Sequence, residues 1–275
     1  MGEVLTFGQA ASLDAESFRA YYLSDLLQRA RSRMREPGCA SAESPDRAGW
    51  TQKRTARRLG VTGRQYREFE RGRVAHSGPR FLDEVAHVLK LSAAERDILY
   101  RLGMRRPALV AGPSRADLSD MQPMLDTLEH IPALITDTAW NVLAWNRADA
   151  ETLQDPRELP EESRNAMLWM FTLTAEARFP QVRDEYNLLV GRVRSAYLAG
   201  MGRNTTLQGL VERLMPNRDA ARQWNAGALA LEPINQQRLL QHPEYGPRRV
   251  HTLTTLIPEQ GMRVIQFVPE LRTGQ

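Results

Sequence analysis

Two short helical patterns separated by a Leu-Gly-Val turn constrain this chain more than any other feature of its 275 residues. Thr51 can cap the first helix and Thr62 the second, and Gly60 supplies the permissive backbone that a sharp turn requires. The surrounding window, 47–80, carries ten basic side chains against two acidic ones, which leaves a local charge of +8. A pair of helices with this charge is typical of a helix-turn-helix that is attracted to phosphate.

The second helix of the pair has two different faces. Tyr66 and Phe69 lie three residues apart and are expected to point into the core, so that Gly63, Arg64, Arg67 and Glu68 point outward. A run of charges is most often only a solvated face. Ten cations inside a helix-turn-helix pattern favour DNA instead.

This segment resembles the Cro/repressor (XRE) type of helix-turn-helix, on the string Thr51-Gln52, Ala56, 59–62, Tyr66 and 69–73. The resemblance implies that Gln52 bonds a phosphate and that the helix from Thr62 enters the major groove. Arg64 is the best candidate to read a base, because a guanidinium can bond guanine with two hydrogen bonds. Glu70 is expected to tie the helix end to neighbouring backbone. The full set expected to contact double-stranded DNA is Thr51, Gln52, Lys53, Thr62, Gly63, Arg64, Gln65, Arg67, Glu68, Arg71 and Arg73.

The chain divides into two domains of different charge. Residues 1–110 hold twenty basic and thirteen acidic side chains, whereas residues 111–275 hold seventeen and twenty. Further helices are predicted over 16–35, 79–89 and 92–102, the last capped by Ser92, which gives a five-helix bundle with a loop at 36–49. We therefore expect a tail (1–15), a DNA-binding domain (16–107), a linker (108–118, with the boundary near 112) and a second domain (119–272).

Several classes of protein do not fit the composition. Cys39 is the only cysteine, so neither an internal disulfide nor a thiolate metal centre is expected. No apolar run reaches the ~20 residues of a membrane span, and no leader pattern is visible. We expect a cytoplasmic protein without membrane contact and without a resident cofactor.

The second half reads as mixed α and β structure. Residues 132–146 predict two strands that turn at 137–140, helices are predicted at 121–129, 147–153, 164–173, 182–198, 207–214 and 218–224, and strands at 229–233, 237–240, 250–256 and 263–268. This order describes an antiparallel sheet with helices gathered on one side. The fold class is an α+β multidomain protein, in which an all-α helix-turn-helix domain precedes an α/β domain.

The second half also resembles the MmyB-like regulator family, through 140–146, Arg164-Asn165, Phe171, Arg194, Trp224 and 242–246. The resemblance implies a PAS-like domain around a cavity for a small apolar ligand such as a fatty acid. The candidate ligand-binding residues are Trp145, Asn146, Arg164, Asn165, Phe171, Arg194, Tyr197, Trp224 and His242.

Plainer roles compete with these assignments. Aromatic side chains at helical spacing are more often core, and the arginines can form structural salt bridges. Asn146 can cap the helix that begins at Arg147, and His242, which precedes a proline, can close a turn.

The favoured function is a one-component transcription regulator, in which a ligand shifts the arrangement of the DNA heads in a homodimer. One alternative keeps the DNA head but makes the second domain a ligand-free dimerisation or partner-binding scaffold. An enzyme domain has no support, because the sequence has no nucleophile elbow, no phosphate loop and no metal-ligand spacing among its histidines. A haem held by His242 is a remote alternative.

Overall fold

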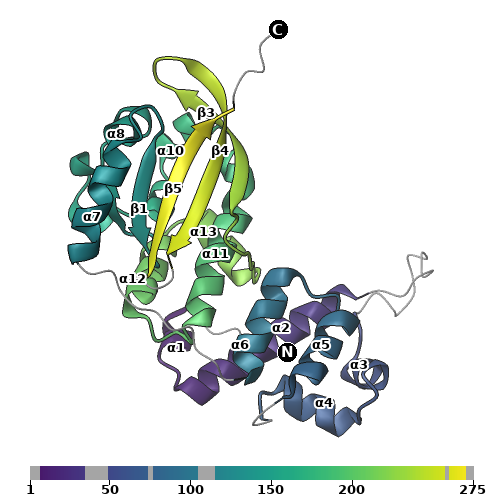
Figure 1. Cartoon of the computed structure of the whole chain (residues 1–275). Coiled ribbons are helices and arrows are strands. Elements are labelled where there is room, and N and C mark those ends of the chain that lie inside the picture. The colour runs from purple at the N-terminus through teal and green to yellow at the C-terminus, as the bar shows by residue number, and fades with distance from the viewer. Residues whose placement is uncertain (1–6, 35–48, 74–76, 105–114, 258–259, 271–275) are drawn as a thin grey trace. The chain divides into compact units, whose positions relative to one another are not determined.

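The computed structural model describes residues 7–34, 49–73, 77–104, 115–257 and 260–270 (Figure 1). They form two compact units. The first comprises residues 1–108, 194–208 and 224–231, and the second comprises 109–193, 209–223 and 232–275. The expected boundary near residue 112 and most of the expected loop at 36–49 lie outside the described residues.

The helical core of the first unit matches the expected five-helix bundle. Its helices are α2 (Ala15–Arg33), α3 (Gln52–Arg58), α4 (Gly63–Glu70), α5 (Pro79–Val88) and α6 (Ala93–Met104). Part of the expected tail forms an additional short helix, α1 (Phe7–Ala11).

Side-chain caps fix where these helices begin. Thr51 accepts a hydrogen bond from the Arg54 amide, and Thr62 and Gln65 form a reciprocal capping box at the start of α4. Ser92 and Glu95 exchange the same pair of bonds before α6. The caps expected at Thr51, Thr62 and Ser92 are therefore confirmed, and each satisfies backbone N–H groups that a helix start leaves unpaired.

The first unit also contains chain from the second half of the sequence. Tyr197 packs against Phe18 and Tyr22 of α2, with ring centroids 5.6 and 6.3 Å apart. Trp224 packs against Phe7 of α1 at 5.7 Å. Arg194 bonds Asp25 of α2, with 2.8 Å between Nη2 and Oδ2.

The second unit is built on an antiparallel sheet in the order β2-β1-β5-β4-β3, whose central strands run side by side in Figure 1. Its strands are β1 (Ala133–Asp137), β2 (Val142–Trp145), β3 (Asn235–His242), β4 (Gly246–Ile257) and β5 (Met262–Pro269). The predicted hairpin is confirmed: Asp137 Oδ1 accepts the amides of Ala139 and Asn141, and Trp140 takes a positive φ of 61° in the turn.

The strand predicted over 229–233 is wrong. This segment pairs with no strand. The Ala230 amide instead donates to Ser195 Oγ, and Pro233 has no N–H to contribute to a ladder.

Helices and helical turns connect β2 to β3. They are α8 (Arg147–Thr152), η2 (Pro156–Glu158), η3 (Glu161–Ser163), α9 (Ala166–Trp169), α10 (Leu173–Arg178), η4 (Val182–Glu185), α11 (Tyr186–Ala199), α12 (Thr205–Leu214) and α13 (Arg218–Asn225). The single helix predicted over 164–173 is wrong. Asn165 caps α9 and Thr172 caps α10, so the segment starts two separate helices.

The sheet has helices on both faces, rather than on one as expected. Helix α7 (Arg115–Asp126) places Leu125 in a core with Ala133 and Ile135 of β1. Successive strand residues point to opposite faces, so Leu134 points to the other side of the sheet.

Candidate functional site

The outward face of the helix-turn-helix is strongly cationic. Tyr66, Phe69 and Glu70 are the buried residues of α4, whereas Arg64 and Arg67 are exposed on the same helix. Lys53 and Arg57 are exposed on α3. Among the described residues these four cations form no ion pair, so their charge is available to an external anion.

A buried ion pair holds the two helices in place. Glu70 is 1% exposed and accepts two 2.9 Å hydrogen bonds from the Arg31 guanidinium and one of 2.9 Å from Gln52 Nε2. Arg31 also donates to the Trp50 carbonyl. Glu70 is thus structural, as expected, but it is tied to the side chains of α2 and α3 rather than to backbone.

Some of the residues expected to contact DNA already have partners. Gln65 Oε1 accepts the Thr62 amide, and Glu68 pairs with Arg71 at 3.8 Å and Arg73 at 3.6 Å. The amide groups of Gln52 and Gln65 each have two N–H donors, so their internal bonds leave a donor for phosphate.

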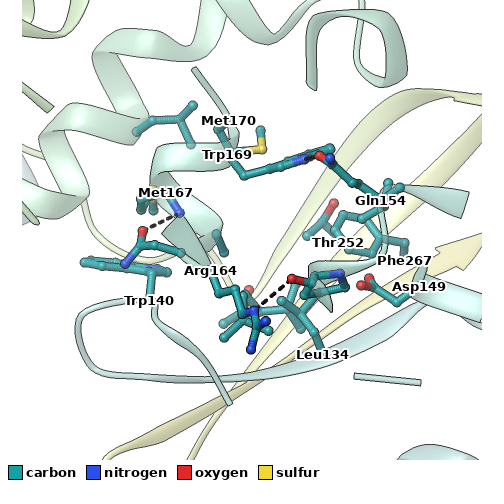
Figure 2. Close-up of a pocket in the computed structure, with 18 of the residues that line it drawn as sticks. Leu134, Trp140, Asp149, Gln154, Arg164, Met167, Trp169, Met170, Thr252 and Phe267 are labelled. Carbon is teal, nitrogen blue, oxygen red and sulfur yellow. Dashed lines mark hydrogen bonds between the residues drawn. The ribbon is translucent and has the colours of Figure 1, made fainter. Parts of the chain in front are cut away.

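The second unit contains a cavity of about 100 Å³ between the sheet and the helices that follow β2 (Figure 2). This volume is well above the roughly 10–15 Å³ that a void needs to hold one water molecule. Its wall is mainly apolar and includes Leu134, Met167, Met170, Trp169, Ile265 and Phe267.

Two buried arginines lie at the β3 side of this cavity. Arg192 of α11 donates from Nη2 to Gln236 Oε1 at 2.8 Å, and its Nη1 lies 3.8 Å from Glu232. Arg238 of β3 donates to Glu185 and Gln236. The Nε atoms of both arginines are buried without a hydrogen-bond partner, and burial lowers the pKa of each guanidinium.

The cluster extends beyond the cavity wall. Arg263 is largely buried, lies 3.6 Å from Glu232 and also interacts with Asp137, so three guanidinium groups face the carboxylates of Glu185, Glu232 and Asp137. Arg192 and Arg238 line the cavity, and their buried, unpartnered Nε–H groups favour an acceptor there.

A buried carboxyl group lies elsewhere in the wall. Asp149 of α8 is 3% exposed, and its Oδ1 has no hydrogen-bond partner. Burial raises the pKa of this carboxyl to about 7. Thr252 of β4 also lines the cavity and has an unpartnered hydroxyl.

Two of the predicted ligand residues, Arg164 and Asn165, line the cavity. Arg164 donates from Nε to the carbonyls of Pro156 and Leu159, at 2.9 and 3.1 Å. Asn165 is 1% exposed; its oxygen caps α9, and its Nδ2 bonds the β1–β2 turn at the Ala139 carbonyl. Asn165 is therefore occupied by structural bonds, whereas those of Arg164 use only its Nε.

Other predicted residues lie outside the wall of this cavity. Asn146 caps α8, which confirms the plainer expectation for it, and its Nδ2 donates to three carbonyls near the end of α7. Trp145 lies in β2, and Phe171 packs on Tyr186 at 4.4 Å. His242 Nδ1 accepts the amides of Glu244 and Tyr245 and so closes the β3–β4 turn.

Arg194, Tyr197 and Trp224 belong to the first unit. Arg194 donates to Asp25 and to the Gly227 carbonyl, and it lies over the rings of Tyr22 and Trp224. These three residues form an aromatic and cationic cluster against α2.

The sequence analysis missed the polar groups that do line the cavity. Gln236 and Arg238 alternate on one face of β3, and Thr252 lies opposite Gln236 in β4. No alternating pattern marked them, because residues 235–238 of this edge strand are all polar. Asp149 gave none, because an acidic residue in the first turn of a helix is ordinary.

Comparison with protein families identifies both halves. The model described as MmyB-like transcription regulator ligand binding domain matches residues 119–273, more than half of the chain, and a helix-turn-helix domain matches residues 23–99. The chain belongs to the MmyB-like transcription regulators. No curated protein matches it.

This membership gives the regulator a DNA-binding domain and a domain that binds a small ligand. The cavity lies within the matched ligand-binding domain. Within the described part of the chain, no helix is both long and apolar enough to span a membrane.

Proposed function

We propose that the chain is a one-component regulator in which α4 enters the major groove of an operator and Arg64 reads a base. The observation that carries this proposal is the exposed cationic face of α3 and α4, held by the buried Arg31–Glu70 pair. A rigid scaffold supports base reading because it fixes where a guanidinium meets the groove. Gln52, Lys53 and Arg67 contact phosphates, and Arg73 extends the same contact.

The experiment is a binding titration with the operator and with random DNA. Arg64→Ala weakens operator binding by about 1–3 kcal/mol and random DNA much less. Arg67→Ala is the matched control, since it removes the same charge from the same helix and should weaken both duplexes alike. Equal losses on both duplexes for Arg64→Ala would refute its assignment as the base reader.

The second domain acts as a PAS-like sensor whose ligand is an apolar carboxylic acid. The apolar wall accepts the chain of such a molecule, and the buried, unpartnered Nε donors of Arg192 and Arg238 bind its carboxylate.

Native mass spectrometry of the purified full chain tests the sensor. A stoichiometric adduct that Arg192→Met abolishes would support it. A chain that carries no adduct and binds no added acid would instead favour the ligand-free scaffold.

The regulator works as a homodimer, because one major-groove helix gives limited affinity and two half-sites a helical turn apart bind together. Helix α11 offers a route for the signal: Arg192 lines the cavity, and two residues later Arg194 bonds Asp25 of α2. Asp25→Asn should reduce the effect of ligand on DNA affinity while ligand affinity stays unchanged.

A further inference from the structure

The cavity has a second polar position, on a different element from Arg192 and Arg238. Helix α8, which carries Asp149, packs against β1, whereas Arg238 lies on β3. The end of α8 reaches β3 at His242, which lies 3.3 Å from Thr152. His242 is four residues from Arg238, which corresponds to about 13 Å along the strand.

Asp149 is not used by the helix in which it lies. Asn146 caps α8, so Asp149 is the third residue of the helix, where a carboxylate usually accepts the amide of the capping residue. Here the Asn146 amide donates to the Ala133 carbonyl at 3.0 Å. Asp149 Oδ1 therefore remains buried and unpartnered in the cavity wall.

A buried acceptor without a partner is costly, whereas the same atom is stabilising once a donor reaches it. Among the residues that the structure describes, no cation pairs with Asp149, and burial raises the pKa of its carboxyl. The wall residues Leu134, Leu153 and Pro156 offer no side-chain donor, and Arg164 donates from Nε to the carbonyls of Pro156 and Leu159.

We propose that the ligand is a hydroxylated carboxylic acid, whose carboxylate lies at Arg192 and Arg238 and whose hydroxyl, at the other end of its apolar chain, donates a hydrogen bond to Asp149. This inference rests on the proposed sensor function and names the ligand class of the same cavity. The proposed ligand differs from a simple fatty acid because it has polar groups at both ends.

The test compares medium-chain ω-hydroxy acids with unsubstituted acids of equal chain length, by calorimetric titration of the full-length protein above the Asp149 pKa of about 7. A hydrogen bond to a charged group predicts that the hydroxy acid binds at least about tenfold more tightly. Asp149→Leu, which offers no acceptor, should remove this preference. Asp149→Asn, which keeps an acceptor, should retain part of it.

The outcomes separate the two proposals. Plain and hydroxylated acids that bind the native protein equally, or a preference that persists in Asp149→Leu, would overturn the hydroxyl inference and leave the sensor intact. If Asp149→Leu binds neither acid, loss of the preference in Asp149→Asn would overturn the inference, and its retention would support it. Failure of every acid to bind the native protein would overturn both proposals.

Discussion

Replacing Asp149 by Asn should make the ligand-free protein more stable at neutral and alkaline pH. The folded-state pKa of this carboxyl is about 7, against 3.8 for the free group, so the folded protein holds the proton more tightly than the unfolded chain. Stability is therefore unaffected below pH 3.8 and falls as pH rises from there towards 7. At 1.36 kcal/mol per pKa unit, the loss reaches about 4 kcal/mol above the folded-state pKa.

The measurable part of this loss lies in an accessible pH range. Between about pH 5 and about pH 8, proton linkage gives a loss of about 2–3 kcal/mol from Asp149 alone. Urea denaturation of the native chain and Asp149→Asn across that range measures it, because the difference between the two curves removes groups common to both. The variant should gain stability relative to the native chain as pH rises.

Asp184→Asn is the matched control, because Asp184 is exposed on η4 and its substitution should leave the pH dependence unchanged. Parallel curves for the native chain and Asp149→Asn would refute the reasoning. They would mean that the buried carboxyl has a partner or solvent that offsets its desolvation.

Three further outcomes follow from the contacts. Lys53→Ala should lower the slope of log affinity against log salt by about one without changing sequence preference, which titrations at several salt concentrations measure. Gly72→Ala should lower the free energy of unfolding, measured in urea, by at least about 1–2 kcal/mol, because φ is +69° there and the added Cβ would lie 2.6 Å from Ala20 Cα. Gly63→Ala is the control, since its Cβ would meet nothing within 4 Å and the free energy of unfolding should fall much less. Asn146→Ala should cost about 3 kcal/mol or more by the same measurement, since it leaves buried backbone groups unpaired; a loss under about 1 kcal/mol would contradict this role.

Local signals in the sequence were sufficient for the helix-turn-helix. Thr51, Thr62 and Ser92 each cap a helix through neighbours within three residues, so the sequence alone could locate these helix starts. The β1–β2 turn was predictable for the same reason. The break at Thr172 was missed because its cap interrupts an otherwise continuous apolar pattern.

The ligand cavity could be predicted only as a family property. Its polar groups come from α8, α11, β3 and β4, and no local pattern reports which of them meet across a sheet. Arg194, Tyr197 and Trp224 have the burial and aromatic character of a binding site, yet their partners lie in α2, about 170 residues earlier in the case of Arg194. Composition cannot distinguish a ligand from a distant helix as the partner of a buried arginine.

The packing of Tyr197 and Trp224 against α1 and α2 has a practical consequence for anyone who would cut this gene at the end of its helix-turn-helix match. A fragment that stops there would lose the aromatic cover of Phe18 and Tyr22, and Asp25 would lose its partner Arg194. Such a head should be less stable and prone to self-association through the uncovered rings. The DNA-binding domain of this regulator is therefore completed by residues that lie, in the sequence, within the ligand-binding half.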